Sequence, residues 1–266
     1  MNGRVLVVAG SDSGGGAGIQ ADIKTLTALG AYAATAITAL TAQNTEAVLA
    51  IVPVAPDFVR RQMEAVLGDI GADCVKTGML VDGAVIDAIA DCLAAAAPAM
   101  PLVVDPVLMS SSGTRLLDER AIELLKRRLI ARARLVTPNV PEAAALTGLA
   151  VASLDDMRRA ADRLLALGAA AVMVKGGHLA GDRLSDLVVD GAQSFVIAAP
   201  RIATRSTHGT GCTLASAIAA GIAQGMTLRP AIERAHAYVQ RAIATAPGLG
   251  RGHGPLNHAH PCEPIR

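Results

Sequence analysis

A cysteine stands at the start of an apolar run in the segment THGTGCTLASAIAAGIAQG, residues 207–225. A glycine-rich turn that leads into a helix points successive backbone N–H groups into one concavity, and the helix dipole adds positive character there. Such a concavity suits an anion, above all a transferring phosphoryl group. The dipole is also expected to lower the pKa of the Cys212 thiol. Gly209, Gly211 and Cys212 are therefore candidates for an anion hole, and the alternative is a tight turn that needs small residues.

Lysine is rare in this chain, so the position of each one is informative. Twenty of the 24 basic residues are arginine, and none of the four lysines follows a glycine, which excludes a Walker A phosphate loop. Lys175 ends a predicted strand in VMVKGG, where its ammonium could reach a phosphate. The alternative is a surface lysine whose aliphatic stem lies along the protein. For Lys76, in CVKTGML, the two interpretations are equally good.

Two acidic residues and an amide pair also follow predicted strands. Asp105 in VVDPVLM and Glu142 in PNVPE could hold Mg²⁺ through carboxylate oxygens, directly or through water. Glu142 could instead be a helix-start acid that interacts with the helix dipole. Gln43 and Asn44 offer a paired donor and acceptor to the edge of a heterocycle, or they form an ordinary turn. The segment GSDSGGGAG lacks the dinucleotide-binding spacing, and we expect it to form a backbone lid over a flat ligand.

The composition points to a protein that handles small molecules. At 266 residues, with 52% hydrophobic and 18% charged residues, the chain can bury a sizeable core and is not expected to be disordered. A net charge of +1 and only 2% aromatic residues argue against binding to nucleic acid or to an anionic membrane. No cysteine spacing matches a zinc site or a redox pair. The N-terminal apolar run is too short for a signal peptide or a membrane span, so a cytoplasmic location with free thiols is expected.

Strand and helix patterns alternate along the chain, which predicts an α/β fold with a mostly parallel sheet and helices on both faces. A late hairpin, 187–190 with 194–197, is expected to add antiparallel strands at one edge. Residues 1–266 are predicted to form a single domain with an irregular tail, 247–266. Ligands of such sheets bind beyond the carboxyl ends of the strands, where these motifs lie. The predicted strands are 4–9, 35–40, 74–77, 102–104, 135–137 and 171–175, and the predicted helices are 18–29, 56–70, 82–96, 122–129, 153–168, 211–224 and 230–246.

Taken together, these motifs resemble the hydroxymethylpyrimidine/phosphomethylpyrimidine kinases of thiamine biosynthesis, in the ribokinase-like superfamily. The motifs are AGSDSGGGAGIQAD, ITALTAQNT, VKTGML, DPVLM, TPNVPEAAALTG, VKGGH and THGTGCTLASAIAA, and the resemblance runs from about residue 5 to residue 260. It implies a three-layer α/β/α fold and a homodimer. It also implies two successive phosphorylations, of the pyrimidine alcohol and then of its monophosphate, with ATP and Mg²⁺ as cofactors.

The resemblance also implies a role for each matching residue. Gln43 would pair with the aminopyrimidine, and Cys212 with Gly209 and Gly211 would form the anion hole. In the wider superfamily an aspartate base occupies the position of Cys212, so the thiol is a candidate base and the identity of the proton acceptor is open. GSDSGGG has a glycine where the family commonly has a second serine. The remaining implied contacts are Gly10, Asp22, Met79 and Val107 around the pyrimidine, Lys175, Asn139 and Thr210 at the ATP phosphates, and Asp105 with Glu142 at Mg²⁺.

Two other functions compete with this interpretation. A pyridoxine/pyridoxal kinase is the nearer one, because some relatives with cysteine in the anion hole phosphorylate that alcohol; Gln43 favours an aminopyrimidine. A non-catalytic pyrimidine-binding protein with the same fold is the other. The presence of Lys175, Asp105, Glu142 and the GTGC turn argues against it.

Overall fold

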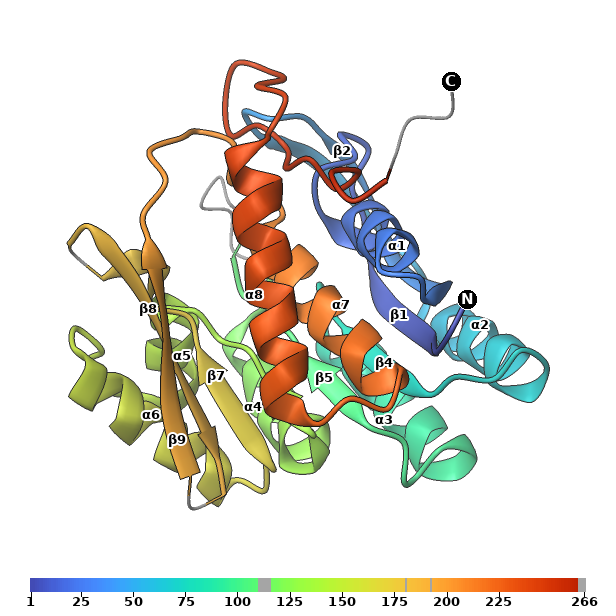
Figure 1. The fold of residues 1–266 in the computed structure, drawn as a ribbon. Helices are drawn as coiled ribbons and strands as arrows, with labels where there is room; N and C mark the ends of the chain where they lie inside the picture. Colours follow the sequence, from blue (N-terminus) through green and yellow to red (C-terminus); the bar gives the residue numbers. More distant parts are fainter. Residues whose placement is uncertain (110–115, 180, 192, 263–266) are drawn as a thin grey trace.

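The computed structural model describes residues 1–109, 116–179, 181–191 and 193–262, and nine of its segments pair into one sheet. The strand order is β3-β2-β1-β4-β5-β6-β7-β8-β9, and the strands from β2 to β7 in that order are parallel. β3 pairs antiparallel with β2 at one edge, and β8 and β9 form an antiparallel hairpin at the other edge (Figure 1). The strands are β1 (Arg4–Ser11), β2 (Tyr32–Gln43), β3 (Val48–Pro53), β4 (Cys74–Thr77), β5 (Leu102–Val104), β6 (Leu135–Val136), β7 (Ala171–Val174), β8 (Arg183–Asp190) and β9 (Gln193–Pro200).

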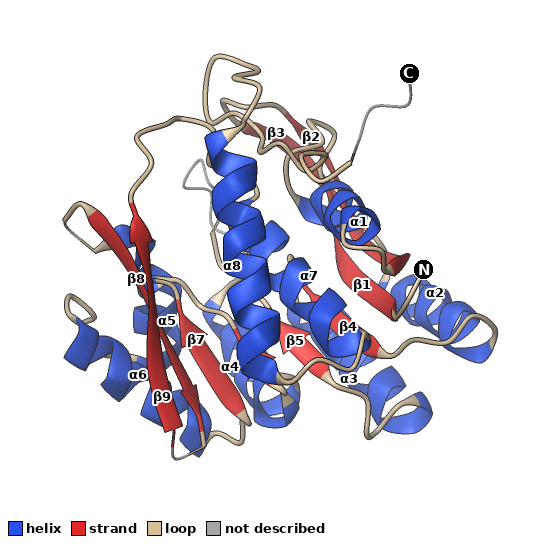
Figure 2. Cartoon of the chain, in the orientation of Figure 1, coloured by secondary structure: helices blue, strands red, loops and turns tan. Residues whose placement is uncertain are grey.

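Helices cover both faces of the sheet and complete three layers (Figure 2). Helices α1, α7 and α8 pack on one face, and α2 to α6 pack on the other. The connections between the parallel strands pass through these helices, which is the arrangement that buries both faces of a parallel sheet. The helices are α1 (Gly18–Ala28), α2 (Pro56–Gly68), α3 (Gly83–Ala96), α4 (Glu119–Arg128), α5 (Val140–Thr147), α6 (Leu154–Ala166), α7 (Thr210–Ala223) and α8 (Leu228–Ala244), with short 3₁₀ turns η1 (Ile130–Arg132) and η2 (Gly176–His178).

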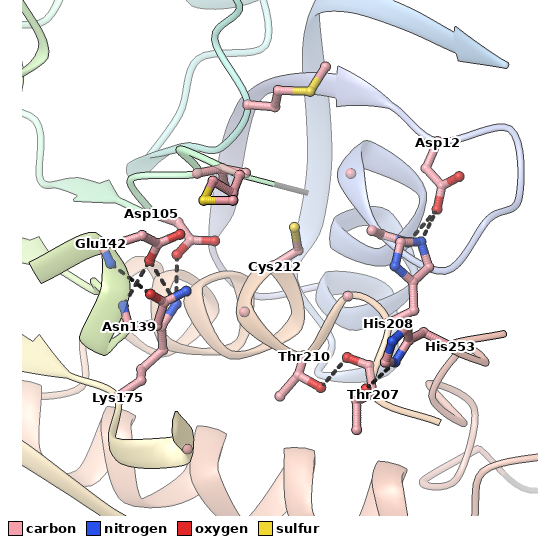
Figure 3. A pocket seen from close by; sticks show the side chains of 18 of the residues that line it. Asp12, Asp105, Asn139, Glu142, Lys175, Thr207, His208, Thr210, Cys212 and His253 are labelled. Carbon is pink, nitrogen blue, oxygen red and sulfur yellow. Dashed lines mark hydrogen bonds and ion pairs between the residues drawn. The ribbon is translucent and has the colours of Figure 1, made fainter. Parts of the chain in front are cut away.

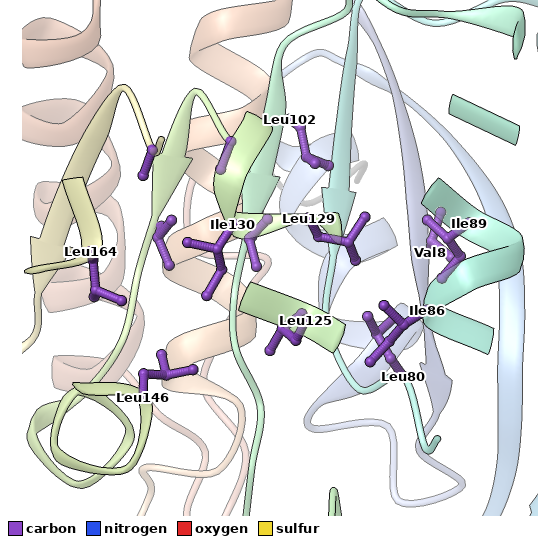
Figure 4. Close-up of a cluster of buried hydrophobic side chains, with 14 of the residues drawn as sticks. Val8, Leu80, Ile86, Ile89, Leu102, Leu125, Leu129, Ile130, Leu146 and Leu164 are labelled. Carbon is purple, nitrogen blue, oxygen red and sulfur yellow. The ribbon is translucent and has the colours of Figure 1, made fainter. Parts of the chain in front are cut away.

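Two aliphatic cores lie on the two faces of the sheet. The larger core lies against α2 to α6 and consists almost entirely of Leu, Ile, Val and Ala side chains (Figure 4). Within β1, Leu6 and Val8 enter this core, whereas Val5 and Val7 enter the core under α1, α7 and α8. This alternation follows from the two-residue period of a strand. Both faces of β1 are therefore apolar, as expected for the centre of a parallel sheet.

The predicted fold is confirmed, including the antiparallel hairpin at the β9 edge. β3 and α5 were not predicted. The sequence of β3, VLAIVP, is a short apolar run without alternation, and such a run does not by itself distinguish strand from helix. Helix α5 has only eight residues and contains a proline in its first turn. Among the described residues, no helix is both long and apolar enough to cross a membrane.

The described part of the C-terminal tail contains no helix or strand, but it is tied to the fold by its backbone. His253 N donates to Thr45 O, and His208 N donates to Gly254 O. Pro255 forms an isolated bridge with His208. We call residues 251–256 the C-terminal strap, because they join the end of β2 to the loop that precedes α7. The last four residues, 263–266, lie outside the described part of the chain.

A buried ion pair connects the sheet to two of the helices. Lys76 Nζ on β4 lies 2.9 Å from Asp22 Oδ1 on α1, and both side chains are fully buried. Ser216 Oγ on α7 donates to the same carboxylate at 2.6 Å. Burial lowers the pKa of Lys76, but the adjacent Asp22 carboxylate outweighs this and the net shift is upward. Three segments distant in the sequence therefore meet at one charge pair.

Replacing Lys76 with methionine is expected to lower the free energy of unfolding by about 3–5 kcal/mol, because the Asp22 carboxylate would stay buried without its counter-ion. The double variant Lys76→Met/Asp22→Leu removes both charges and should recover more than half of that loss. Urea unfolding followed by circular dichroism measures both variants. Wild-type stability in the single variant, or lower stability in the double variant than in the single one, would contradict this account.

Candidate active site

A cavity of about 680 Å³ opens at the carboxyl ends of the parallel strands, and Figure 3 shows part of its lining. Twelve of the thirteen residues predicted for the site line this cavity. The exception is Asp22, which is buried in the ion pair with Lys76. The twelve are Gly10, Gln43, Met79, Asp105, Val107, Asn139, Glu142, Lys175, Gly209, Thr210, Gly211 and Cys212.

One end of the cavity is charged. Lys175 Nζ lies 3.0 Å from Asp105 Oδ1 and 4.0 Å from Glu142 Oε2. Thr137 Oγ1 donates to Asp105 Oδ1 at 3.1 Å. Burial lowers the pKa of Lys175, but the Asp105 and Glu142 carboxylates raise it by more, so the ammonium is held in its charged form. Lys175, Asp105 and Glu142, which follow three different strands, thus lie together.

The start of α5 positions Glu142. Asn139 accepts a hydrogen bond from Glu142 N at 2.9 Å, and Glu142 Oε2 accepts one from Asn139 N at 2.7 Å, which is a complete capping box. Burial raises the pKa of Glu142 to about 7, with Lys175 opposing the rise and Asp105 adding to it. Glu142 is thus both a helix-start acid and a cavity residue, and its binding of Mg²⁺ stays a prediction. The backbone of Asn139 also forms an isolated parallel β-bridge with that of Lys175, in which Lys175 N donates to Pro138 O.

The first turn of α7 forms the floor of the cavity beside Lys175. Gly209 caps the helix with φ +82°, and a Cβ there would lie 1.9 Å from Gly16 O. A Cβ on Gly211 would lie 3.2 Å from Lys175 Nζ and 3.5 Å from Asp105 Oδ2. The backbone of the turn therefore approaches the charged group directly, with no side chain between them. N–H groups in the first turn of a helix have no intrahelical acceptor, so this end of α7 can bind an anion.

Cys212 lies in the same turn, between the charged group and the Asp12–His208 pair in the view of Figure 3. Burial raises the pKa of its thiol to about 11; Lys76 opposes the rise, Asp22 and Asp105 add to it, and Gly18 N–H lowers it again. The expectation that the helix dipole lowers this pKa is wrong. Desolvation outweighs the dipole here, because the half-buried thiol is screened from water and the Asp22 and Asp105 carboxylates lie nearby. The thiol is therefore neutral near pH 7.

The opposite end of the cavity is built around Asp12, which the sequence analysis did not select. Its carboxylate accepts hydrogen bonds from the backbone N–H groups of Gly14, Gly16 and Ala17 at 2.8–3.0 Å. It also lies 2.8 Å from His208 Nε2. The glycine-rich segment thus wraps around its own aspartate. An Asx-type pattern, an aspartate followed by glycines, was the available signal.

Gln43 lies beside this pair at the end of β2. Its Nε2 lies 3.3 Å from His208 Nε2, and its Oε1 accepts from Thr41 Oγ1 at 3.3 Å. Ser13 Oγ holds the backbone of Gln43 by accepting from its N–H at 2.8 Å. Nothing in the spacing of the sequence indicated that His208, 165 residues away, would contact Gln43, because only the folded sheet and the C-terminal strap bring them together.

Met79 and Val107 contribute apolar wall, whereas Lys76 and Asp22 do not reach the cavity. Met79 packs against Gly10 so closely that a Cβ on the glycine would lie 2.4 Å from Met79 Cε. Val107 lines the same cavity. Lys76, in contrast, is fully buried against Asp22, so the phosphate-binding interpretation of Lys76 is wrong. The expectation that Asp22 borders the pyrimidine pocket does not agree with its position either, because its carboxylate is satisfied by Lys76 and Ser216.

The geometry can now be compared with known proteins. A sequence model of phosphomethylpyrimidine kinases matches residues 12–257. The chain belongs to the phosphomethylpyrimidine kinase family. A hydroxymethylpyrimidine/phosphomethylpyrimidine kinase from Streptomyces coelicolor is 47% identical, with 96% of this chain and 93% of that protein covered. The resemblance drawn from the motifs is confirmed.

Two further similar proteins differ from this chain, one in its length and the other in the alcohol named as its substrate. The thiamine biosynthesis bifunctional protein ThiED of Geobacter sulfurreducens is 54% identical over 99% of this chain, and the chain spans 54% of the length of that protein. A pyridoxal kinase from Bacillus subtilis, solved as an ADP complex, superposes with a TM-score of 0.89 at 33% identity, covering 97% of this chain and 98% of that one. The kinase family therefore shares its fold with kinases of a different alcohol.

The neutral state of the Cys212 thiol can be tested by alkylation. Iodoacetamide is expected to label Cys212 much more slowly than the exposed Cys262 at pH 7.5, and the Cys212 rate should keep rising about tenfold per pH unit up to pH 10, because only the thiolate reacts. Peptide mass spectrometry measures both rates in one sample. A Cys212 rate that levels off below pH 8 would show that its pKa is lowered instead.

Proposed function

We propose that this chain transfers a phosphoryl group from ATP to 4-amino-5-hydroxymethyl-2-methylpyrimidine and then to its monophosphate, in the synthesis of thiamine diphosphate. The observation that carries the proposal is one cavity with two different ends. Lys175 and the first turn of α7 meet at one end, where Gly211 leaves no side chain between them. Gln43 presents a donor and an acceptor at the other. Family membership and the names of the relatives agree with it.

Phosphoryl transfer requires alignment and charge stabilisation more than covalent chemistry. The Lys175 ammonium and the N–H groups at the start of α7 are placed to stabilise the charge on the transferring group, with Asn139 and Thr210 beside the phosphates. At the pyrimidine end, the Gln43 amide pairs with the ring, and Gly10, Met79 and Val107 enclose its faces. The proposal leaves Asp22 as a structural residue and not a pocket residue.

We propose Mg²⁺ as the second cofactor, held partly by Asp105 and Glu142. Within the described residues, no group of three or more His, Cys, Asp or Glu side chains could hold a metal ion. A site with two carboxylates fits Mg²⁺, because this ion keeps several waters and is commonly bound by one or two carboxylates together with substrate phosphates. When bound, the ion supplies positive charge to the phosphate oxygens. The role of Asp105 and Glu142 is to orient it beside Lys175.

The neutral Cys212 thiol is not the proton acceptor in this proposal. A thiol with a pKa of about 11 is already protonated near pH 7 and cannot take the proton of the substrate hydroxyl. The proton instead passes to water or to the phosphate itself, which a loose phosphoryl-transfer transition state permits. Cys212 contributes its backbone N–H to the anion hole and a small side chain beneath the substrate.

We also propose the domain organisation, the oligomeric state and the cellular location of the chain. The chain acts as a single kinase domain, because all nine strands of the described residues pair into one sheet. It forms a homodimer, and the exposed Leu40, Leu49 and Val52 of the β2–β3 ribbon offer an apolar surface for contact. It works in the cytoplasm, where its four cysteines stay as free thiols.

Pyridoxal phosphorylation is the second candidate, because the Bacillus subtilis pyridoxal kinase has the same fold. ADP release from ATP·Mg²⁺ should be measured with the pyrimidine alcohol, its monophosphate and pyridoxine. Both pyrimidines are expected to be substrates, and kcat/KM for the pyrimidine alcohol should exceed that for pyridoxine by about tenfold or more, because pyridoxine leaves the Gln43 amide partly unpaired. Equal or greater kcat/KM for pyridoxine would favour the second candidate, and no turnover of any alcohol would favour a binding protein.

The anion hole can be tested by comparing two small substitutions in the first turn of α7. Gly211→Ala places a methyl group 3.2 Å from Lys175 Nζ, where phosphate must also approach, and kcat should fall by about 10²-fold or more. Cys212→Ala keeps the backbone N–H and removes a neutral thiol, so kcat should fall by less than about tenfold. Steady-state kinetics at saturating ATP measures both variants. A loss of more than 10²-fold in Cys212→Ala would restore the thiol as the base.

A further inference from the structure

Four side chains form a continuous hydrogen-bonded chain around the Gln43 amide. Asp12 Oδ2 lies 2.8 Å from His208 Nε2, and the amide of Gln43 lies 3.3 Å from the same nitrogen. On its other side Gln43 Oε1 lies 3.3 Å from Thr41 Oγ1, and Thr41 Oγ1 lies 2.9 Å from Ser11 O, so the single hydroxyl hydrogen is given to the shorter contact. Asp12 and His208 are buried, whereas the sequence analysis assigned them no role.

Asp12 determines which nitrogen of His208 carries hydrogen. Burial would raise the pKa of Asp12, but the hydrogen bond with His208 and the backbone N–H groups of Ala17 and Gly14 lower it further, so the carboxylate is ionised near pH 7. An ionised carboxylate only accepts hydrogen bonds. The nitrogen that faces it at 2.8 Å, Nε2, must therefore be an N–H donor.

The hydrogen on His208 Nε2 in turn restricts the orientation of the Gln43 amide. The structure turns the Gln43 NH₂ group toward His208, but an Nε2–H group cannot accept from it. The hydrogen bonding therefore requires the reverse orientation, with the amide oxygen toward His208. A half-turn about the last side-chain bond exchanges oxygen and nitrogen without moving the amide. The NH₂ group then faces Thr41 Oγ1, which donates its own hydrogen to Ser11 O and can accept. Each of the four contacts then joins a donor to an acceptor.

We propose that Asp12 and His208 are positioning residues that fix the orientation of the Gln43 amide and thereby select the donor and acceptor pattern of the substrate ring. In this orientation the amide keeps one N–H and one oxygen lone pair for a ligand, in a fixed order along the cavity wall. The N–H matches an unprotonated ring nitrogen, and the oxygen matches a neighbouring exocyclic amine. The inference rests on the proposed pyrimidine substrate, and it adds the reason why an amino ring is accepted and its oxo analogue is not.

The backbone holds His208 in place independently of Gln43. His208 N donates to Gly254 O, and His208 bridges Pro255 in the C-terminal strap. The C-terminal strap therefore holds the backbone of His208, and Asp12 orients its ring. Gln43, in contrast, belongs to β2. This separation makes it practical to remove the ring nitrogens without removing the Gln43 side chain.

The test compares two rings that differ only at this edge: the 4-amino hydroxymethylpyrimidine and its 4-oxo analogue, which presents an N–H and a carbonyl in the opposite order. Calorimetric titration gives the Kd of each ring for the wild type, for His208→Phe, and for His208→Leu as a second variant in case the first does not fold. His253→Phe is the matched control, because His253 lines the same cavity and contacts Thr207 but not Gln43.

The wild type is expected to prefer the amino ring by about 10- to 100-fold, the range for one matched pair of hydrogen bonds. In the His208 variants the amide can turn over, so the ratio of the two Kd values should fall below about threefold, with the oxo ring gaining affinity relative to the amino ring. The His253 control should keep the wild-type ratio. A loss of packing alone would weaken both rings equally.

The outcomes separate this inference from the proposed function. If the wild type binds the amino ring selectively and both His208 variants keep that ratio, the positioning role is wrong and the proposed substrate stands. If the wild type binds the amino ring without discriminating against the oxo ring, the fixed orientation of Gln43 is wrong. If the wild type binds neither ring, the proposed function fails and the inference fails with it.

Discussion

The first turn of α7 approaches two lysines, one fully buried and one 14% exposed, and most of the site depends on that approach. Lys175 lies where a Cβ on Gly211 would be 3.2 Å away, and Lys76 lies behind the turn, where its charge acts on Cys212. An uncompensated ammonium in the interior would be strongly destabilising, so each lysine requires a carboxylate. Asp105 and Glu142 balance the charge of Lys175, and Asp22 balances that of Lys76. The positive end of α7 is thus placed among balanced charges.

The two ion pairs have different surroundings, and this separates structure from chemistry. Lys76 and Asp22 are completely buried, and Ser216 completes the hydrogen bonding of the carboxylate. Lys175 is 14% exposed and faces the cavity, so its ammonium can act on a ligand. The pKa of Glu142, raised to about 7 by burial and by Asp105, shows that negative charge at this end is costly without more positive charge nearby. A magnesium ion would supply that charge.

The Gln43 end of the cavity is organised by hydrogen bonds around Asp12. Asp12 holds the glycine-rich segment through three backbone N–H groups and holds His208 through its ring. The C-terminal strap closes this end by joining Thr45 to the residues before α7. Segments from the start, the first fifth and the end of the sequence therefore meet around Gln43. The irregular tail predicted from the sequence is a structural part of the site.

The amino-acid sequence by itself determined the α/β class, the parallel centre of the sheet and the residues at its carboxyl edge, because period-2 and period-3.6 patterns and glycine-rich turns are local. It also identified Lys175, Asp105, Glu142 and Gln43 as cavity residues, since all of them follow strands that end at one edge. Only the tertiary structure decided which lysine faces the cavity, because Lys76 and Lys175 both follow apolar strand residues and differ in whether a helix covers them. The pKa of Cys212 was also a tertiary outcome: the helix dipole is local, but the desolvation that outweighs it comes from surrounding segments distant in sequence. The contact between His208 and Gln43, 165 residues apart, has no local signal at all.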